Sequence, residues 1–180
     1  SGPWMTIEEL CAATVMFSDN AAANILLSGI QGPEGLTAFL RVNGDGITRL
    51  DRTETALNEN LPGDERDTST PDAMARTLHR FLLVDGVLRA ADCEKLVGWM
   101  VSSPTGRDRI RGGVPATWRA ADKTGTSDDT HNATNDVAIL WPPNAAPIVV
   151  VAYLSDSTVD LPARKAAHAE IGRIIAEEWA

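Results

Sequence analysis

The sequence is poor in basic residues and in long apolar runs. Its 180 residues carry 16 lysines and arginines against 25 aspartates and glutamates, a formal net charge of −9. A nucleic-acid partner needs a basic surface to meet its phosphates, so this balance argues against one. No apolar run reaches the roughly 18 residues that a membrane-spanning helix needs. We therefore expect no nucleic-acid partner and no membrane span.

Residues that bind metals are also scarce. The two cysteines, Cys11 and Cys93, form no CxxC pair, and the three histidines are scattered along the chain. Zinc sites in proteins need closely spaced Cys and His ligands, so we expect no metal and no cofactor. Hydrophobic residues make up 43% and charged residues 23%, as in ordinary globular proteins. The length suffices for one domain or two small ones with a real core.

The first half of the chain shows the apolar periodicity of helices. Thr6 followed by Glu9 has the form of a capping box, which predicts a helix from there to about Phe17. Further helices are expected over about 20–27, 33–42, 71–83 and 90–101. Between the third and fourth lies a polar stretch, 50–71. A loop of this length inside a compact domain is usually functional.

The second half changes to strand patterns. Segments 117–124, 135–141 and 148–154 are predicted strands, and 162–179 is a predicted final helix. The third strand, IVVVAYL, is apolar at consecutive positions, so we expect both of its faces to be buried. This order predicts two parts: residues 1–100 mostly α-helical and residues 101–180 in an α/β arrangement.

Three short polar stretches are candidates for chemistry. They are Ser18-Asp19-Asn20, the segment Glu54 to Asn58 in the long loop, and Lys123-Thr124-Gly125-Thr126 near a strand end. Taken singly, each has a plain structural interpretation. Asp and Asn are good helix caps, a loop glutamate is usually solvated, and a KTG tripeptide can simply lead a strand into a turn.

Together, in this order, the three stretches resemble the class A serine β-lactamases, of which SDN and KTG are signatures. LNENLPGDERDTSTP (57–71) is similar to that family's Ω-shaped active-site loop, which would span about 52–67. RIRGGVPATWRAADKTGT (109–126) is similar to the approach to its substrate-binding strand. The resemblance implies a two-part, D,D-peptidase-like α+β fold, β-lactam hydrolysis through an acyl-enzyme, and a periplasmic or secreted location.

The resemblance also implies roles for single residues. Glu54 would be the base that activates the deacylating water, and Asn58 would help to hold that water. Ser18 would relay a proton to the departing β-lactam nitrogen. Asn20 would bind the amide of the substrate side chain.

Further matching positions would bind the substrate carboxylate or support the loop. The carboxylate site would combine Lys123, Thr124, Gly125, Thr126 and Arg109, and the Thr126 N–H would be an oxyanion donor. Asn24 would brace the loop glutamate. Arg52 and Asp67 would close the neck of the loop as an ion pair, for which bidentate geometry is suited. Thr55 stands where many members have proline after a commonly cis bond, and the conformation of that bond here stays open.

The family's nucleophilic motif, Ser-x-x-Lys, does not occur, because no serine has a lysine three residues later. The sequence given begins Ser1-Gly2-Pro3-Trp4, in which we expect no signal peptide, and it resembles the C-terminal two-thirds of such an enzyme. We expect an N-terminal fragment to supply the nucleophile and to complete the sheet beside 148–154, and the chain alone to be inactive. The alternatives are a penicillin-binding D,D-peptidase-like protein and a non-catalytic fragment that binds β-lactams or peptidoglycan.

Overall fold

A computed structural model describes residues 4–84, 86–127 and 131–179. The described elements are, in chain order, α1 (Ile7–Phe17), α2 (Asn20–Ser28), α3 (Gly32–Val42), the 3₁₀ turn η1 (Ala56–Asn58), α4 (Pro71–Leu82), α5 (Ala90–Ser102), α6 (Ile110–Gly113), β1 (Arg119–Thr126), β2 (Thr134–Trp141), β3 (Ile148–Leu154) and α7 (Leu161–Glu178).

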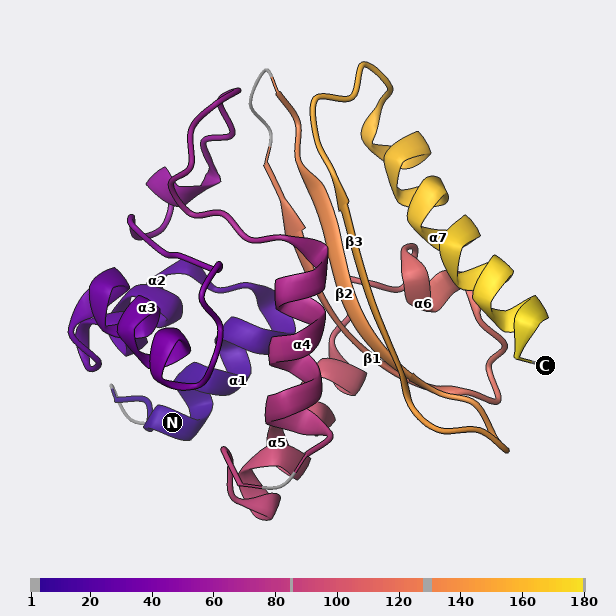
Figure 1. The fold of residues 1–180 in the computed structure, drawn as a ribbon, viewed down its shortest axis with the longest axis horizontal. Helices are drawn as coiled ribbons and strands as arrows, with labels where there is room; N and C mark the ends of the chain where they lie inside the picture. Colours follow the sequence, from indigo (N-terminus) through magenta and orange to yellow (C-terminus); the bar gives the residue numbers. More distant parts are fainter. Residues whose placement is uncertain (1–3, 85, 128–130, 180) are drawn as a thin grey trace.

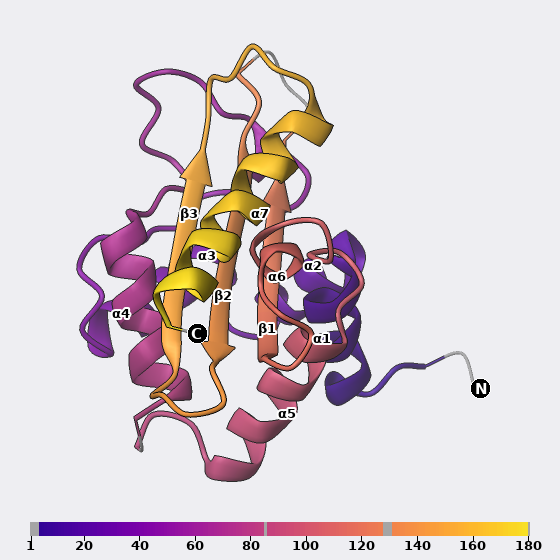
Figure 2. The ribbon, with the colours of Figure 1, turned by 90° about the vertical axis from the view of Figure 1, so that its right-hand side faces the viewer.

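The three strands form one antiparallel sheet in the order β1-β2-β3. Helices α1 to α5 lie on one side of the sheet, where α5 contacts β1 and α4 contacts β3 (Figure 1). Helix α7 crosses the other face over β2 and packs on the short α6 (Figure 2). The described part of the chain therefore matches the expected combination of a helical part with a three-stranded sheet and a C-terminal helix.

The helices begin at the polar residues that the sequence places before them. The Thr6 hydroxyl accepts a hydrogen bond from the Glu9 N–H, and the Glu9 carboxylate accepts the Thr6 N–H, so the predicted capping box is confirmed. Asp19, Thr70 and Asp160 cap α2, α4 and α7 in the same way through their side-chain oxygens. These local signals place the helix starts within about two residues of the expected positions.

The sheet carries a hydrophobic core on each face. Alternation along β1 sends Ala120 toward α7 and Ala121 toward α4 and α5. The core under α7 contains Ile110, Trp118, Ala138, Leu140, Val150 and Ala176. The core under the other helices contains Leu82, Val97, Met100 and Ile139. The end of the sheet that carries the Lys123–Thr126 stretch therefore lies between two packed layers, which hold its strands in place.

The structure differs from the sequence-based expectations at three places. Strand β1 continues to Thr126, so Gly125 and Thr126 pair with Asn135 and Thr134 instead of forming a turn. The short elements η1 and α6 were not predicted. Only Val150 is buried in β3, and its other residues are half-buried, because β3 pairs with β2 alone in the described sheet. Its side chains still pack into both cores, Ile148, Val150 and Ala152 into one and Val149 into the other, so the expected burial of both faces is met only in part.

No helix in the described ranges is long and apolar enough to span a bilayer. Within the same ranges, no cluster of three or more His, Cys, Asp or Glu side chains could hold a metal ion.

Candidate active site

The Ser18-Asp19-Asn20 turn joins two helices at one end of the helical layer. Ser18 ends α1 in the left-handed conformation, with φ 54° and ψ 44°, and its N–H still bonds back into that helix. Asp19 Oδ1 accepts the Ala22 N–H at 2.8 Å, and Asn20 is the first residue of α2. Asp19 therefore braces the junction, and all three residues are exposed and line the cleft described below.

Lys123 on β1 reaches this turn across the gap between the sheet and the helices. Its Nζ donates to Ser18 Oγ and to the Thr124 carbonyl, the latter at 2.7 Å. Burial lowers the pKa of the Lys123 ammonium, and the negative charge of nearby Asp122 opposes that shift. A lysine held against a serine hydroxyl is suited to exchanging a proton with it.

Glu54 is held in the long loop by two asparagines. Asn24 on α2 clasps its backbone: Asn24 Nδ2 donates to the Glu54 carbonyl and the Glu54 N–H donates to Asn24 Oδ1, both at 2.9 Å. Asn58 Nδ2 donates to Glu54 Oε2 at 2.8 Å. The Glu54–Thr55 peptide bond is cis. Asn24 thus fixes the Glu54 backbone, and Asn58 fixes one oxygen of the carboxylate.

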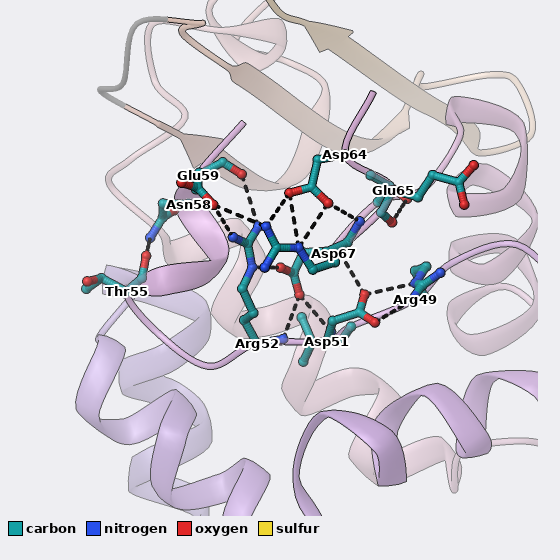
Figure 3. Close-up of polar contacts among 12 residues, drawn as sticks. Arg49, Asp51, Arg52, Thr55, Asn58, Glu59, Asp64, Glu65 and Asp67 are labelled. Carbon is teal, nitrogen blue, oxygen red and sulfur yellow. Dashed lines mark hydrogen bonds and ion pairs between the residues drawn. The ribbon is translucent and has the colours of Figure 1, made fainter. Parts of the chain in front are cut away.

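The neck of the 52–67 loop is closed around the Asp67 carboxylate (Figure 3). Asp67 Oδ1 accepts the N–H groups of Asp51 and Arg52, and Oδ2 accepts Arg52 Nε at 2.5 Å. Asp51 returns the contact by accepting the Asp67 N–H at 2.9 Å. The expected Arg52–Asp67 ion pair is present but not bidentate, because Arg52 Nη1 turns to Glu59 at 2.7 Å.

Arg109 is buried behind the end of β1, with only 3% of its surface exposed. Its Nη1 donates to the carbonyls of Gly125 and Asn135, at 2.9 and 2.5 Å, and its Nη2 donates to Thr126 Oγ1 at 2.6 Å. Burial lowers the pKa of this guanidinium, against the attraction of Asp136. Arg109 therefore joins β1 to β2 and orients the Thr126 hydroxyl, and it is not a surface arginine.

These groups meet in a cleft of about 830 Å³ between the helical layer, the loop and β1. All nine residues proposed above for catalysis or substrate binding line it: Ser18, Asn20, Glu54, Asn58, Arg109, Lys123, Thr124, Gly125 and Thr126. The three supporting residues, Asn24, Arg52 and Asp67, lie behind this lining, in the contacts given above.

Other cleft residues were missed by the sequence analysis. Thr124 Oγ1 donates to Thr105 Oγ1 at 3.0 Å, and Thr105 in turn contacts Ser103 Oγ at 3.0 Å. At the mouth, Lys165 on α7 pairs with Asp108 at 2.8 Å. Thr105 lies in the small, polar stretch SSPTG that precedes Arg109, and this composition was the available signal. No sequence feature near Lys165 indicates a place in the cleft, because its helix lies about 40 positions after the Lys123–Thr126 stretch and comes close to it only in the fold.

Comparison with known proteins identifies relatives of the whole chain. The model of the β-lactamase enzyme family matches residues 1–179. An ancestral (GNCA) class A β-lactamase is 54% identical with a TM-score of 0.95, and the match covers 98% of this chain and 67% of that one. The putative class A β-lactamase PenP from Rhodopseudomonas palustris is 46% identical with a TM-score of 0.94, over 98% of this chain and 66% of that one. The chain thus spans about two-thirds of the length of these relatives.

Proposed function

Because the chain belongs to the class A serine β-lactamase family, we propose that it carries the deacylation base and the substrate-binding groups of a β-lactam hydrolase. The observation that carries this proposal is the convergence of Glu54, the Ser18–Lys123 pair and the Thr124–Thr126 strand end on one cleft of about 830 Å³. A periplasmic or secreted location, where such antibiotics arrive, accompanies the proposal.

In the proposed reaction, a serine hydroxyl of the N-terminal segment gives its proton to the lysine of the same Ser-x-x-Lys motif and attacks the β-lactam carbonyl carbon, and the ring C–N bond breaks. That proton then replaces the one that Ser18 delivers. Ser18, contacted by Lys123, delivers a proton to the departing nitrogen. Glu54 then takes a proton from a water positioned with Asn58, and the resulting hydroxide attacks the acyl carbonyl carbon. The ester C–O bond breaks, and the proton passes from Glu54 to the departing serine oxygen. Asn20 binds the substrate side-chain amide throughout.

The substrate carboxylate is assigned to the end of β1. Lys123 supplies positive charge, and the Thr124 and Thr126 hydroxyls supply hydrogen-bond donors. Gly125, which has no side chain, would let the substrate approach the backbone closely. A Cβ there would make only an ordinary contact with Asn135 at 3.7 Å. Arg109 acts from behind through its bond to Thr126.

The nucleophile is assigned to an N-terminal segment corresponding to the remaining third of the relatives. Support comes from a hollow of about 660 Å³ between the helices and the sheet, which reaches Lys123 and Thr124. It is lined largely by apolar side chains, among them Val15, Leu36, Leu40, Met74, Leu78, Leu82, Leu96, Met100 and Val137. An apolar surface of this kind favours an amphipathic helix as its occupant.

The test is nitrocefin hydrolysis by the chain combined with an N-terminal segment that bears Ser-x-x-Lys. We expect turnover, and we expect Glu54→Gln to accumulate an acyl-enzyme that mass spectrometry detects, with turnover lowered by roughly 10²–10⁴-fold. Glu59→Gln, on the same loop, is the matched control and should keep its turnover.

Other outcomes identify the alternatives. Acylation without turnover in the unmutated protein would favour a penicillin-binding D,D-peptidase-like protein. Reversible binding without acylation would favour a non-catalytic fragment that binds β-lactams or peptidoglycan. Unimpaired turnover in Glu54→Gln would remove Glu54 from the role of deacylation base.

A further inference from the structure

The carboxyl group of Asp136 lies behind the cleft and takes no part in the reaction as proposed. It is fully buried on β2, with 0% of its surface exposed. Its Oδ2 accepts the N–H of Ile110 at 3.0 Å, while its Oδ1 has no hydrogen-bond partner among the described residues. Ile110 directly follows Arg109, the residue whose guanidinium holds Thr126.

The bond from the Ile110 N–H to Asp136 fixes the backbone next to Arg109, and with it the position from which the Arg109 side chain extends. Arg109 precedes α6 with φ −116° and ψ −141°, and its own N–H donates to the Gly106 carbonyl at 3.0 Å. On the far side, α6 sits directly on α7: a Cβ at Gly172 would lie 2.1 Å from the Ile110 carbonyl oxygen. The Ile110 carbonyl is thus held by packing, and its N–H by Asp136.

The charges of Asp136 and Arg109 are also opposite. The guanidinium of Arg109 donates only to neutral oxygens in the contacts described above. The negative charges of Asp136, Asp108 and Asp122 oppose the lowering of its pKa by burial. A carboxyl group beside a buried cation favours its burial, but the anchoring comes from the Ile110 N–H bond, which an uncharged oxygen can also accept.

We propose that Asp136 is a positioning residue for the carboxylate-binding end of the cleft, acting through the Ile110 N–H and Arg109 on the Thr126 hydroxyl. The proposal rests on the proposed function, because it assigns the substrate carboxylate to Thr126. It predicts that Asp136 matters only for substrates that present a carboxylate there.

The test compares Asp136→Ala with Asp136→Asn in the complete enzyme, the chain with its N-terminal segment. The asparagine keeps an oxygen for the Ile110 N–H, and the alanine removes it. For benzylpenicillin we expect Asp136→Ala to lose roughly 10- to 100-fold in kcat/KM, mostly through KM, as for a lost bond to a charged group. Asp136→Asn should stay within about threefold, since its amide oxygen still accepts that N–H.

Two further measurements separate positioning from general damage. The methyl ester of benzylpenicillin lacks the carboxylate, so Asp136→Ala should not change its kcat/KM. In an Arg109→Ala background, Asp136→Ala should have no further effect on benzylpenicillin, because the residue through which it acts is gone. Equal losses on acid and ester, or additive losses with Arg109→Ala, would overturn the proposal.

A direct readout distinguishes failure of this inference from failure of the proposed function. An unmutated protein without β-lactamase activity would refute the function. The Arg109 Nε–H signal in a ¹⁵N spectrum of the same samples still decides the role of Asp136. We expect that signal to shift and broaden in Asp136→Ala and to persist in Asp136→Asn. An unchanged signal in Asp136→Ala would refute the positioning role.

Discussion

Two ionic networks flank the cleft, and they shift the pKa values of their carboxyl groups in opposite directions. In the loop network, bonds from the side chains of Arg49 and Arg66 hold the pKa values of Asp51 and Asp64 below their usual range. Behind the sheet, burial raises the pKa of Asp122 to about 6 and that of Asp136 to about 7. Arginines accompany the carboxyl groups in both networks.

The difference shows that the hydration of a carboxyl group, more than the number of arginines near it, decides whether its pKa is raised or lowered. Asp122 contacts Arg111, and Arg109 and Arg111 both act to lower the pKa of Asp136, yet burial, aided by repulsion from Asp122, outweighs them. In the loop, water keeps the charged form inexpensive, so the hydrogen bonds dominate. The loop network can therefore pin an exposed segment, whereas the buried network is stable only while its packing is intact.

The largest effect is expected where packing meets the buried network. A Cβ at Gly106 would lie 1.6 Å from Asp122 Oδ2, so Gly106→Ala must displace the carboxylate that contacts Arg111. We expect a loss of about 3–5 kcal/mol in the free energy of unfolding, as for a broken buried ion pair. Denaturant unfolding measures it.

Gly98→Ala is the matched control for Gly106→Ala. A Cβ at Gly98, inside α5, would meet nothing within 4 Å. Alanine is the better helix former there, so this variant should be unchanged or more stable by roughly 0.5–1 kcal/mol. Equal behaviour of the two variants would show that Asp122 relaxes freely and that the buried network is not rigid.

The neck of the loop should give the next effect. Asp67 has φ 56°, a conformation that asparagine tolerates, so Asp67→Asn removes charge without changing the backbone preference. Its side chain is only 5% exposed and accepts from two backbone N–H groups and Arg52. We expect a loss of about 2 kcal/mol by thermal unfolding. Asp64→Asn, at the rim of the same loop, should cost clearly less, and a reversed order would refute the neck as the anchor.

The opposite pKa directions can be tested with pH. The pKa of Asp136 in the folded state, about 7, lies above its ordinary 3.8. Its stabilising contribution is therefore complete below pH 3.8 and is lost as the pH rises to about 7. Asp136→Asn lacks this loss, so its stability relative to the unmutated protein should improve between pH 4 and 7, on the order of 1 kcal/mol.

The charged groups that act on Asp136 or are acted on by it are Asp122 and Lys123 on β1 and Arg109 and Arg111 at α6. On α7, Arg164 and His168 face Arg109 in turn. Asp51→Asn provides the contrast, because a lowered pKa gives stability that is lost as the pH falls. A flat difference between Asp136→Asn and the unmutated protein would mean that Asp136 is ionised throughout this range.

The smallest effect is expected at the exposed rim of the loop network. Arg66 pairs with Asp64 at 2.6 Å, but its side chain is 47% exposed. Exposed ion pairs contribute little because water competes for both partners and salt screens them. Arg66→Gln should leave the melting temperature unchanged within error at physiological salt. A clear destabilisation would show that the rim, and not only the neck, holds the loop.

Much of this molecule follows from short-range features of the sequence. The capping residues Thr6, Asp19 and Thr70 start their helices because each satisfies N–H groups within three residues. The Ser18-Asp19-Asn20 junction, the polar loop and the KTG strand were recognisable from adjacent letters. Their combination also indicated the family and the residues that line the cleft.

Other features depend on contacts between residues far apart in the chain. Arg109 donates to Thr126 across 17 positions, and the Ile110 N–H donates to Asp136 across 26. Asn24 bonds to the Glu54 backbone across 30 positions. The half-buried state of β3 likewise depends on which strand lies beside it. How deeply a side chain is buried and which residue it contacts depend on how the layers pack. Hydrophobic pattern and capping determine which elements form, and only their packing decides which buried charges meet.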